Sequence, residues 1–555
     1  AEVPQHPDPQ SSPGASRHVA PLLKWRYRRV ERYIDDHLED RIMLADMARI
    51  VGLTRMHFAA QFRVATGVKP HEFLLQRRIA RACGFLRDES LSLVEIALKV
   101  GFQSQAHFTT VFKRIVGESV DVWADIFRDG HDIIAAALIW RREPDHEWRR
   151  VPMHLHSNDR WTASFTPEEL GRYIYAIEAW TDEFATWRHG FELKQKAGQE
   201  LTLDALEGAA LMTRAQAGGT EAAKIILRQC EDYLRTGNVA SLLAPESQEA
   251  MAESQHRPDI CRSTLFPLIV DRPRARCGAW YEMVPRSQGQ DPTRHGTFRD
   301  CIARLPDVAA MGFDVVYFTP IHPIGRTNRK GRNNSLTAMA GDPGSPYAIG
   351  AAEGGHDAVH PELGTIEDFR AFVAACRRLD IEVALDFAVQ CSPDHPWLTQ
   401  HPDWFKRRPD GSMRYAENPP KKYEDIVNPD FSCDDAGSLW NALRDVILFW
   451  VNQGVRIFRI DNPHTKPFNF WEWLIREVQT KDPGVIFLAE AFTRPKVMKG
   501  LAKLGFTQSY TYFTWRTRKW EIESYLTELT GHPERDYYRP NFFVNTPDIL
   551  PYHLQ

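Results

Sequence analysis

Three short apolar runs in the second half of the chain each end at an acidic residue, and this repeated pattern constrains the fold more than any other feature. The runs and their acids are Gly454–Ile460 with Asp461, Ile486–Ala489 with Glu490, and Asn541–Val544 with Asp548. Each run has the length of a buried strand, and helical segments lie between the runs, as in a parallel α/β sheet. Barrel enzymes place catalytic groups at the C-terminal ends of such strands.

The residues around the first acid point to a particular chemistry. Arg459 and Asp461 lie two apart on a strand, so their side chains share a face and the arginine favours the ionised carboxylate. Glycosyl transfer uses two carboxyl groups, one as nucleophile and one protonated as general acid. A single strand often ends in an acid by chance, as a helix cap or a turn, but three such strands in order are a stronger signal.

Strands and helices alternate from about Arg274, which predicts a catalytic barrel domain over residues 274–555. We expect strands at Gly278–Val284, Val315–Thr319, Glu382–Phe387, Val455–Ile460, Ile486–Ala489, Gln508–Phe513 and Asn541–Val544. Helices are expected between them, for example at Arg299–Met311, Ile366–Leu379 and Leu439–Gln453. Residues 320–364 are rich in glycine, asparagine and charge and predict a functional loop. Because the chain stops just past the seventh strand, we expect a (β/α)8-type barrel truncated after strand 7.

The bulk composition predicts a multidomain cytoplasmic protein. The chain has 555 residues, enough for several domains. Its eight cysteines are scattered without a CxxC pair, which indicates reduced thiols and neither a disulfide framework nor a zinc site. The apolar run Ile133–Trp140 is too short to span a membrane. Residues 1–20 are polar and lack an apolar core, so they predict a disordered tail and not a signal peptide.

The charge distribution suggests two unrelated tasks. Residues 21–120 carry 17 Lys and Arg against 11 Asp and Glu, a net charge of +6, in a chain whose total is −4. A basic block joined to an acidic body is typical of a nucleic-acid-binding module attached to another domain.

Two copies of one pattern follow a predicted amphipathic helix at residues 25–40. The first copy runs from Leu44 through Gly52, and the second runs from Leu93 through Gly101. A helical segment from Pro70 to Leu86 joins them. Each copy reads as a short helix, a turn at the glycine and a second helix, which is a helix-turn-helix.

This doubled motif resembles the DNA-binding domain of the AraC/XylS family of transcription regulators, over roughly residues 25–117 of a domain expected at 21–117. The resemblance implies that the helices beginning at Thr54 and Gln103 enter successive major grooves of duplex DNA. The implied DNA contacts are Arg55, His57, Gln103, Ser104 and Gln105. The alternative for each of the five is a helix-capping or solvated side chain.

The regulator pattern stops after Gly117. Residues 118–188 predict a β-sandwich domain from alternating apolar and polar positions. The expected strands are Val120–Ala124, Ile133–Trp140, Arg149–Met153, Trp161–Phe165 and Gly171–Trp180. Residues 189–273 predict a helical insert followed by a return to the sandwich.

Residues from about 113 to 555 resemble the α-1,4-glucan:maltose-1-phosphate maltosyltransferases of glycoside hydrolase family 13. The sandwich, the insert and the barrel come in that family's order, and conserved regions fall at Leu385-Asp386, Gly454–Asp461, Glu490 and Asn545–Asp548. The resemblance implies that Asp461 is the nucleophile, Glu490 the general acid/base and Asp548 the transition-state stabiliser. It also implies that Arg459 orients Asp461, and that configuration is retained through a glycosyl-enzyme intermediate.

Differences between this sequence and those of ordinary amylases make the resemblance more specific. Amylases carry Asn-His after the third strand and a His before the last Asp, where this chain has Gln390-Cys391-Ser392 and Thr546-Pro547. The resemblance implies donor-sugar contacts from Lys330, Gln390, Asp425 and Asn462, and stacking of Tyr347 on the reactive sugar. The alternatives are a helix cap for Asp425 and a plain solvated loop for Lys330 and Arg332.

The resemblances together imply a maltosyltransferase fused to a DNA-binding module. It would move maltosyl from α-maltose 1-phosphate to the non-reducing end of an α-1,4-glucan and release phosphate, with no metal or redox cofactor. The alternative is an AraC-type regulator whose enzyme-like part is inactive or senses sugar. A hydrolytic α-amylase is disfavoured by the missing Asn-His and His positions. A homodimer through the sandwich and the helical insert is a further expectation of the family resemblance.

Overall fold

A computed structural model describes residues 21–66, 68–85, 92–103, 105, 108, 119–215, 220–254, 257, 259–291, 294–544 and 546, except the side chains of residues 83 and 84. The predicted tail at residues 1–20 lies outside this part of the chain. Two compact units are present. The first comprises Ala1–Trp140, Glu147–Glu168 and Tyr175–Phe266, and the second comprises Arg141–His146, Glu169–Ile174 and Pro267–Gln555. Within the described ranges, every helix falls short of the length and apolarity needed to cross a bilayer.

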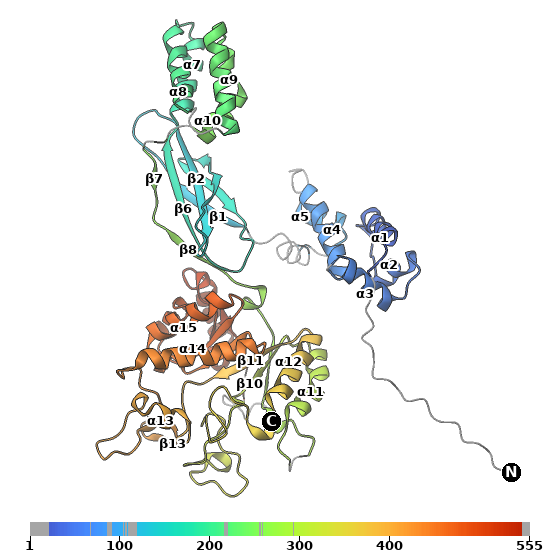
Figure 1. Ribbon diagram of the computed structural model, residues 1–555, viewed down its shortest axis with the longest axis vertical. Helices are drawn as coiled ribbons and strands as arrows, with labels where there is room; N and C mark the ends of the chain where they lie inside the picture. The colour runs from blue at the N-terminus through green and yellow to red at the C-terminus, as the bar shows by residue number, and fades with distance from the viewer. Residues whose placement is uncertain are drawn as a thin grey trace, which may run out of the picture. The chain divides into compact units, whose positions relative to one another are not determined.

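The helix-turn-helix prediction agrees with the helices of the N-terminal region (Figure 1). They are α1 (Lys24–Asp36), α2 (Leu44–Ile50), α3 (Arg55–Thr66), α4 (Pro70–Phe85) and α5 (Leu93–Lys99). Ser92 caps α5, because its hydroxyl accepts the Glu95 N–H while the Glu95 carboxylate accepts the Ser92 N–H. The turns after α2 and α5 contain Gly52 and Gly101 with φ of +66° and +78°, a conformation that favours glycine. Most of the helix expected from Gln103 lies outside the described residues.

The predicted sandwich strands are present in two antiparallel sheets. One sheet has the order β1-β5-β4, and the other has the order β3-β2-β6-β7, with β8 also paired to β6. The strands are β1 (Val120–Asp125), β2 (Ile134–Arg142), β3 (Arg149–Pro152), β4 (His154–Ser157), β5 (Arg160–Phe165), β6 (Gly171–Thr181), β7 (Cys261–Arg262) and β8 (Phe266–Val270). Strand β4 was not predicted, because its four exposed residues show no apolar alternation.

Four helices lie between β6 and β7 and share one apolar core. They are α7 (Glu183–Lys196), α8 (Thr202–Ala215), α9 (Glu221–Thr236) and α10 (Pro245–Ser254). Asp182 caps α7 by accepting the Ala185 N–H, so the helices start a few residues earlier than the composition suggested.

The predicted parallel sheet is present in the second unit. Seven parallel strands run in the order β17-β16-β15-β14-β11-β10-β9. They are β9 (Trp280–Met283), β10 (Val315–Phe318), β11 (Glu382–Phe387), β14 (Ile457–Asp461), β15 (Ile486–Glu490), β16 (Gln508–Tyr510) and β17 (Pro540–Asn541). The helices that follow them are α11 (Phe298–Ala310), α12 (Ile366–Arg378), α14 (Ala436–Asn452), α15 (Phe468–Lys481), α16 (Pro495–Lys503) and α17 (Lys519–Thr530).

Two connections of this sheet carry additional structure. The segment between β10 and α12 is a long loop, as predicted, with only short 3-10 turns at Arg332–Asn334 and Pro361–Leu363. The segment between β11 and α14 contains an antiparallel hairpin that was not predicted, β12 (Tyr415–Asn418) and β13 (Lys421–Val427). Both connections leave from the C-terminal ends of strands, where a barrel carries its functional loops.

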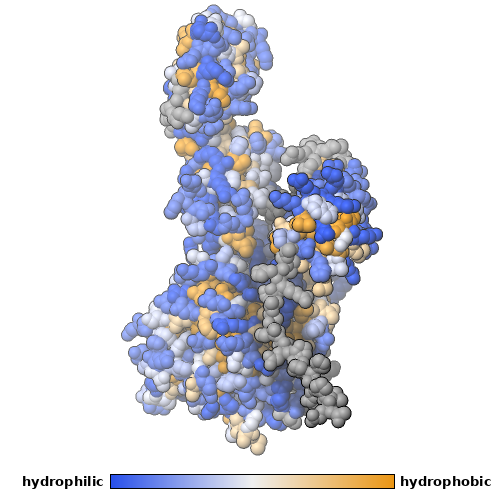
Figure 2. Space-filling view, turned by 45° about the vertical axis from the view of Figure 1, so that its right-hand side comes forward, coloured by the Kyte–Doolittle hydropathy of each residue, from blue (hydrophilic) through white to orange (hydrophobic). Residues whose placement is uncertain are grey.

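Hydrophilic side chains cover most of the face shown in Figure 2, and hydrophobic side chains gather there in small patches. This agrees with a composition of 26% charged residues. The apolar residues instead fill the sheet and the helices around it, where Phe318, Phe372, Trp450 and Phe487 are almost fully buried.

Candidate active site

The acids predicted at the ends of the fourth and fifth barrel strands lie side by side. Asp461 is the last residue of β14 and Glu490 is the last residue of β15, and the two are register partners in the parallel sheet. Neighbouring strands are about 4.8 Å apart, so the two side chains emerge together at the C-terminal edge. The structure therefore brings together the two carboxyl groups that the sequence pattern singled out.

Arg459 joins these carboxyl groups to a third one. Its Nη1 donates to Asp461 Oδ1 at 2.9 Å and to Asp386 Oδ2 at 2.8 Å, and its Nη2 lies 3.6 Å from Glu490 Oε2. The side chain is buried, which opposes its charge, yet the nearby acids hold the pKa of Arg459 well above its ordinary value. One buried cation thus fixes the positions of three acids.

Glu490 has the environment of a general acid. Only 8% of the residue is exposed, and this burial raises its pKa to about 7, although Arg459 works in the opposite direction. The backbone N–H of Asn462 donates to Glu490 Oε2 at 3.0 Å. Near neutral pH a large fraction of Glu490 is protonated, as proton donation to a leaving group requires.

Asp461 has donors on both of its oxygens. Arg459 donates to Oδ1, and the side-chain amide of Asn462 donates to Oδ2 at 3.4 Å. Asn462 takes a left-handed conformation with φ of +42°, which turns the chain away directly after the strand. The carboxylate is fixed at the rim of the sheet by these neighbours, as an attacking group must be.

Asp386, expected at the close of the third barrel strand but without a predicted role, is also a member of this cluster. Its Oδ2 accepts hydrogen bonds from Tyr317 Oη at 2.6 Å, Tyr347 Oη at 2.8 Å and Arg459. Burial raises its pKa to about 6, and Oδ1 has no hydrogen-bond partner among the described residues. The available signal was its position one residue before the end of β11, close to the level at which β14 and β15 end in acids.

Tyr347 and Gln390, both predicted to contact sugar, reach the cluster through Asp386. Gln390 Nε2 donates to the Tyr347 carbonyl at 3.3 Å, and the Tyr347 hydroxyl donates to Asp386. Asn462, another predicted sugar contact, is exposed beside Asp461. Three of the predicted binding residues therefore lie within one chain of contacts around Arg459.

Lys330 and Asp425, the other two predicted sugar contacts, influence each other. Burial raises the pKa of Asp425, and the charge of Lys330 lowers it. Lys330 is 6% exposed and Asp425 is 2% exposed on β13, so the solvated loop is wrong for Lys330 and the helix cap is wrong for Asp425. Arg332 is exposed, as the solvated-loop alternative expects. Asp425 Oδ1 is buried and has no hydrogen-bond partner among the described residues. Such an oxygen can accept a hydrogen bond from a ligand.

Two further polar residues, His464 and Lys466, follow Asp461 and were not among the predicted site residues. Burial lowers the pKa of Lys466 to about 8, although Asp461 opposes this shift, and burial also lowers the pKa of His464. Lys466 Nζ donates to Thr465 Oγ1 at 2.8 Å. Their places three and five residues after the predicted nucleophile were the only sequence signal.

Two predicted site residues lie outside the described part of the chain, and four others belong to the first unit. Asp548 and Ser104 lie outside the described residues. Arg55, His57, Gln103 and Gln105 are exposed in the helix-turn-helix region. The His57 ring lies with Nδ1 3.1 Å from Thr54 Oγ1, so His57 has a local partner at the start of α3.

A buried group of His356, His395 and Cys391 has the residue types of a metal site. The ring nitrogens of the two histidines are already engaged. His356 Nδ1 lies 3.1 Å from His395 Nε2, His356 Nε2 lies 3.0 Å from the Ala388 carbonyl, and His395 Nδ1 accepts the Trp397 N–H. This hydrogen-bonded chain does not fit a metal ion, because each ligating nitrogen would have to give up its partner.

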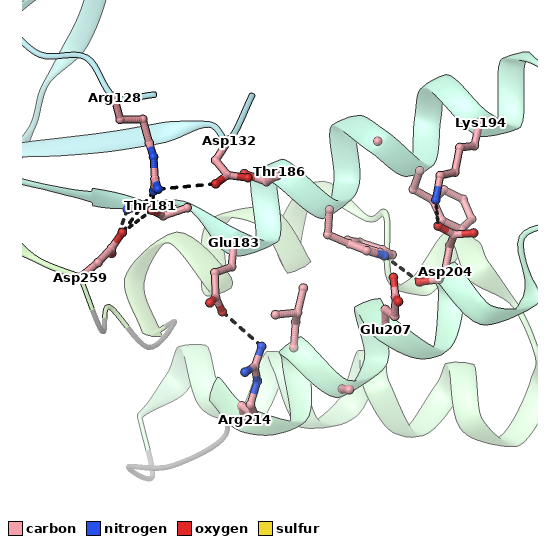
Figure 3. A pocket seen from close by; sticks show the side chains of 15 residues that line it. Arg128, Asp132, Thr181, Glu183, Thr186, Lys194, Asp204, Glu207, Arg214 and Asp259 are labelled. Carbon is pink, nitrogen blue, oxygen red and sulfur yellow. Dashed lines mark hydrogen bonds and ion pairs between the residues drawn. The ribbon is translucent and has the colours of Figure 1, made fainter. Parts of the chain in front are cut away.

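A cavity of about 680 Å³ lies in the first unit, with walls from α7, α8 and the ends of nearby strands (Figure 3). Its cations are paired with acids that also line it, since Arg128 faces Asp132 and Asp259, Arg214 faces Glu183, and Lys194 contacts Asp204. It has no lining residue in common with the carboxylate cluster. This cavity therefore does not lie at the paired acids.

Two adjacent carboxyl groups at the C-terminal edge of a parallel sheet, bridged by one arginine, define the class of glycosyl-transferring barrel enzymes. Residues 108–272 match the family described as alpha-1,4-glucan:maltose-1-phosphate maltosyltransferase, domain N/S, and residues 47–125 match a helix-turn-helix domain family.

Curated relatives extend the first match along most of the chain. The alpha-1,4-glucan:maltose-1-phosphate maltosyltransferase of Pseudomonas aeruginosa is 57% identical over 440 residues, covering 78% of this chain and 66% of that protein. Its counterpart in Rhodospirillum rubrum is 54% identical over 463 residues, covering 80% and 67%. One from Cereibacter sphaeroides is 54% identical over 447 residues, covering 80% and 75%. The chain therefore belongs to the alpha-1,4-glucan:maltose-1-phosphate maltosyltransferase family, and it spans about two thirds of the length of the first two relatives.

Among solved structures, an alpha-amylase from Lactobacillus plantarum is similar with a TM-score of 0.38 and 25% identity, covering 47% of this chain and 60% of that one.

Proposed function

We propose that the second unit transfers a maltosyl group from α-maltose 1-phosphate to the non-reducing end of an α-1,4-glucan, releasing phosphate and retaining the α configuration. The names of its relatives supply the donor and the acceptor. The observation that carries the proposal is the register pairing of Asp461 with Glu490 under a shared Arg459.

The different environments of Asp461 and Glu490 give the two acids different roles in the reaction. Asp461 attacks the anomeric carbon, the bond to the phosphate oxygen breaks, and Glu490 donates its proton to the departing phosphate. Glu490, now ionised, removes a proton from the 4-hydroxyl of the glucan. That oxygen attacks the anomeric carbon from the face that phosphate left, and the bond between the anomeric carbon and Asp461 breaks. Two inversions give net retention. Lys330, Gln390, Asp425, Asn462 and Tyr347 would hold the donor sugar, and Asp548 would support the transition state.

Phosphate release from α-maltose 1-phosphate in the presence of glycogen tests this function in the 555-residue chain. The wild-type chain is expected to release phosphate and lengthen the glucan, and Asp461→Ala is expected to do neither. Glucan hydrolysis without the phosphorylated donor would instead identify a hydrolytic amylase.

We further infer that the helix-turn-helix region binds duplex DNA. The observation in favour is the repetition of one turn geometry at Gly52 and Gly101 within a block of net charge +6. Binding that weakens steeply with salt is expected, because cationic side chains displace counterions from phosphates. If DNA binds and no maltosyl transfer occurs, the chain is a regulator with an inactive or sugar-sensing enzyme-like part.

A further inference from the structure

The two helix-turn-helix copies have separate apolar cores. One cluster contains Val30, Ile34, Phe58 and Phe62, and the other contains Ile96, Val100 and Phe102. Helix α4 contributes Leu74 to the first cluster and residues such as Leu75 and Ile79 to the second. Among the described residues, α4 is therefore the element that the two apolar cores share.

One buried charged side chain on α4 connects the two copies. Arg78 is 9% exposed, and its guanidinium donates from Nη2 to the Asp40 carbonyl at 2.6 Å and from Nη1 to the Gly101 carbonyl at 2.9 Å. Asp40 precedes α2 of the first copy, whereas Gly101 lies in the turn of the second. The guanidinium carbon also lies 5.9 Å from the centre of the Phe102 ring, within the second core. The planar guanidinium has its N–H donors in a fixed geometry, so it can bind two carbonyl oxygens at a set separation. The ammonium group of a lysine lacks this fixed geometry.

Gly101 allows this close approach. A Cβ at this position would overlap the Leu38 carbonyl oxygen and lie 2.6 Å from Arg78 Nη2. Gly52 occupies the same place in the first copy, and the two turns share their backbone hydrogen bonds. Gly52 N–H donates to Arg49 O at 3.1 Å, and Gly101 N–H donates to Leu98 O at 3.0 Å. A Cβ on Gly52 would meet nothing within 4 Å, so the chain supplies its own matched control.

We propose that Arg78, seated against Gly101, is a positioning residue that fixes the two helix-turn-helix copies relative to each other so that both engage one DNA duplex. The proposal rests on the inferred DNA binding. Two recognition helices reach successive major grooves only when their separation matches about one helical turn of DNA. We call the two hydrogen bonds from Arg78 to the Asp40 and Gly101 carbonyls the Arg78 clamp. Without this clamp one helix-turn-helix copy still binds DNA, but the second no longer reaches its major groove.

The test uses the full chain and a fluorescein-labelled 24-base-pair duplex of random sequence, with binding measured across a series of salt concentrations. Arg78→Met removes both N–H donors but keeps a side chain of similar length. Arg78→Lys keeps the positive charge but removes the planar guanidinium. Gly101→Ala should act like Arg78→Met, and Gly52→Ala is the control. Because the salt slope counts neutralised phosphates, we expect it to fall to about half in Arg78→Met, Arg78→Lys and Gly101→Ala, and to stay at the wild-type value in Gly52→Ala.

Hydrogen exchange without DNA gives a second readout, which decides the proposal even if the wild-type chain fails to bind DNA. In Arg78→Met we expect peptides containing Asp40 and Phe102 to exchange about tenfold faster, while peptides of α3 stay unchanged. The proposal is wrong if both peptides of Arg78→Met exchange at the wild-type rate. It is also wrong if the chain binds DNA and the salt slope of Arg78→Met equals that of the wild type. Absence of wild-type DNA binding combined with faster exchange would remove the DNA function and leave the clamp between the copies.

Discussion

Asp461 and Glu490 are register partners at the last residues of β14 and β15, and the guanidinium of Arg459 contacts both. The two acids differ in their surroundings. Asp461 has donors on both oxygens, whereas burial raises the pKa of Glu490 to about 7. Two neighbouring acids in unlike environments can divide the roles of nucleophile and proton donor between them.

The pH dependence of maltosyl transfer should report Glu490. Its raised pKa means that the protonated form, which acts as the acid, is lost as pH rises through about 7. We expect kcat/KM for maltose 1-phosphate to fall about tenfold per pH unit above that value. In Glu490→Gln the fall should be absent and the remaining rate about 10²–10⁴-fold lower. A wild-type profile that is flat from pH 6 to 9 would rule out Glu490 as the proton donor.

The hydroxyl of Tyr347 should matter through Asp386. Tyr347→Phe removes a 2.8 Å hydrogen bond to a buried carboxylate while leaving the ring in place. Hydrogen bonds to charged groups contribute about 1.5–3 kcal/mol, so we expect a loss of about 10–100-fold in kcat/KM. Tyr423→Phe, in the same group of partly buried aromatic residues near Ile426, is the comparison. Equal losses in both variants would show that the effect does not depend on Asp386.

Acid should destabilise the second unit through its buried histidines. Burial lowers the pKa to about 3 for His322, about 4 for His356 and about 2 for His395, all below the unfolded value of about 6.5. The neutral forms thus stabilise the fold fully above pH 6.5, and this contribution falls as pH drops from 6.5 toward the folded values. Between pH 6.5 and its folded pKa, each histidine can lower the free energy of unfolding by about 1.4 kcal/mol per pH unit. Urea unfolding at pH 5 and pH 7 measures the difference, which His322→Asn should reduce.

Two glycines of the helical region should respond in opposite ways to alanine. A Cβ on Gly208 would overlap the indole ring of Trp187, whereas a Cβ on Gly190 would meet nothing within 4 Å. We expect Gly208→Ala to lower the free energy of unfolding by about 1–3 kcal/mol and Gly190→Ala to raise it by about 0.5–1 kcal/mol. Chemical denaturation of both variants checks this pair, and a neutral Gly208→Ala would contradict the described packing of α7 on α8.

The sequence allowed the parallel sheet to be predicted because its signals are local. Apolar runs such as Glu382–Phe387 are bounded by helices with clear start signals, including Thr365 before α12. Asp461 and Glu490 were found for the same reason, since each ends such a run. The β12–β13 hairpin was missed because its strands contain many charged and exposed residues.

The role of Asp386 could not be predicted because it depends on contacts distant in sequence. Its partners come from β10, from the loop after β10 and from β14, at separations of 69, 39 and 73 residues. The lowered pKa of Lys466 likewise depends on burial, which no local pattern encodes. In the sequence, Arg78 cannot be distinguished from an exposed helical arginine, because its carbonyl partners are distant along the chain.

The most direct test of the central claim is the mass of the Asp461 peptide after Glu490→Gln is incubated with α-maltose 1-phosphate. Phosphate is a good leaving group, so the first step proceeds slowly without the acid, but the second step lacks its base. We expect the peptide containing Asp461 to gain one maltosyl group, and Asp461→Ala combined with Glu490→Gln to gain none. A maltosyl group on another peptide, or no adduct in a chain whose wild type transfers maltose, would contradict Asp461 as the nucleophile.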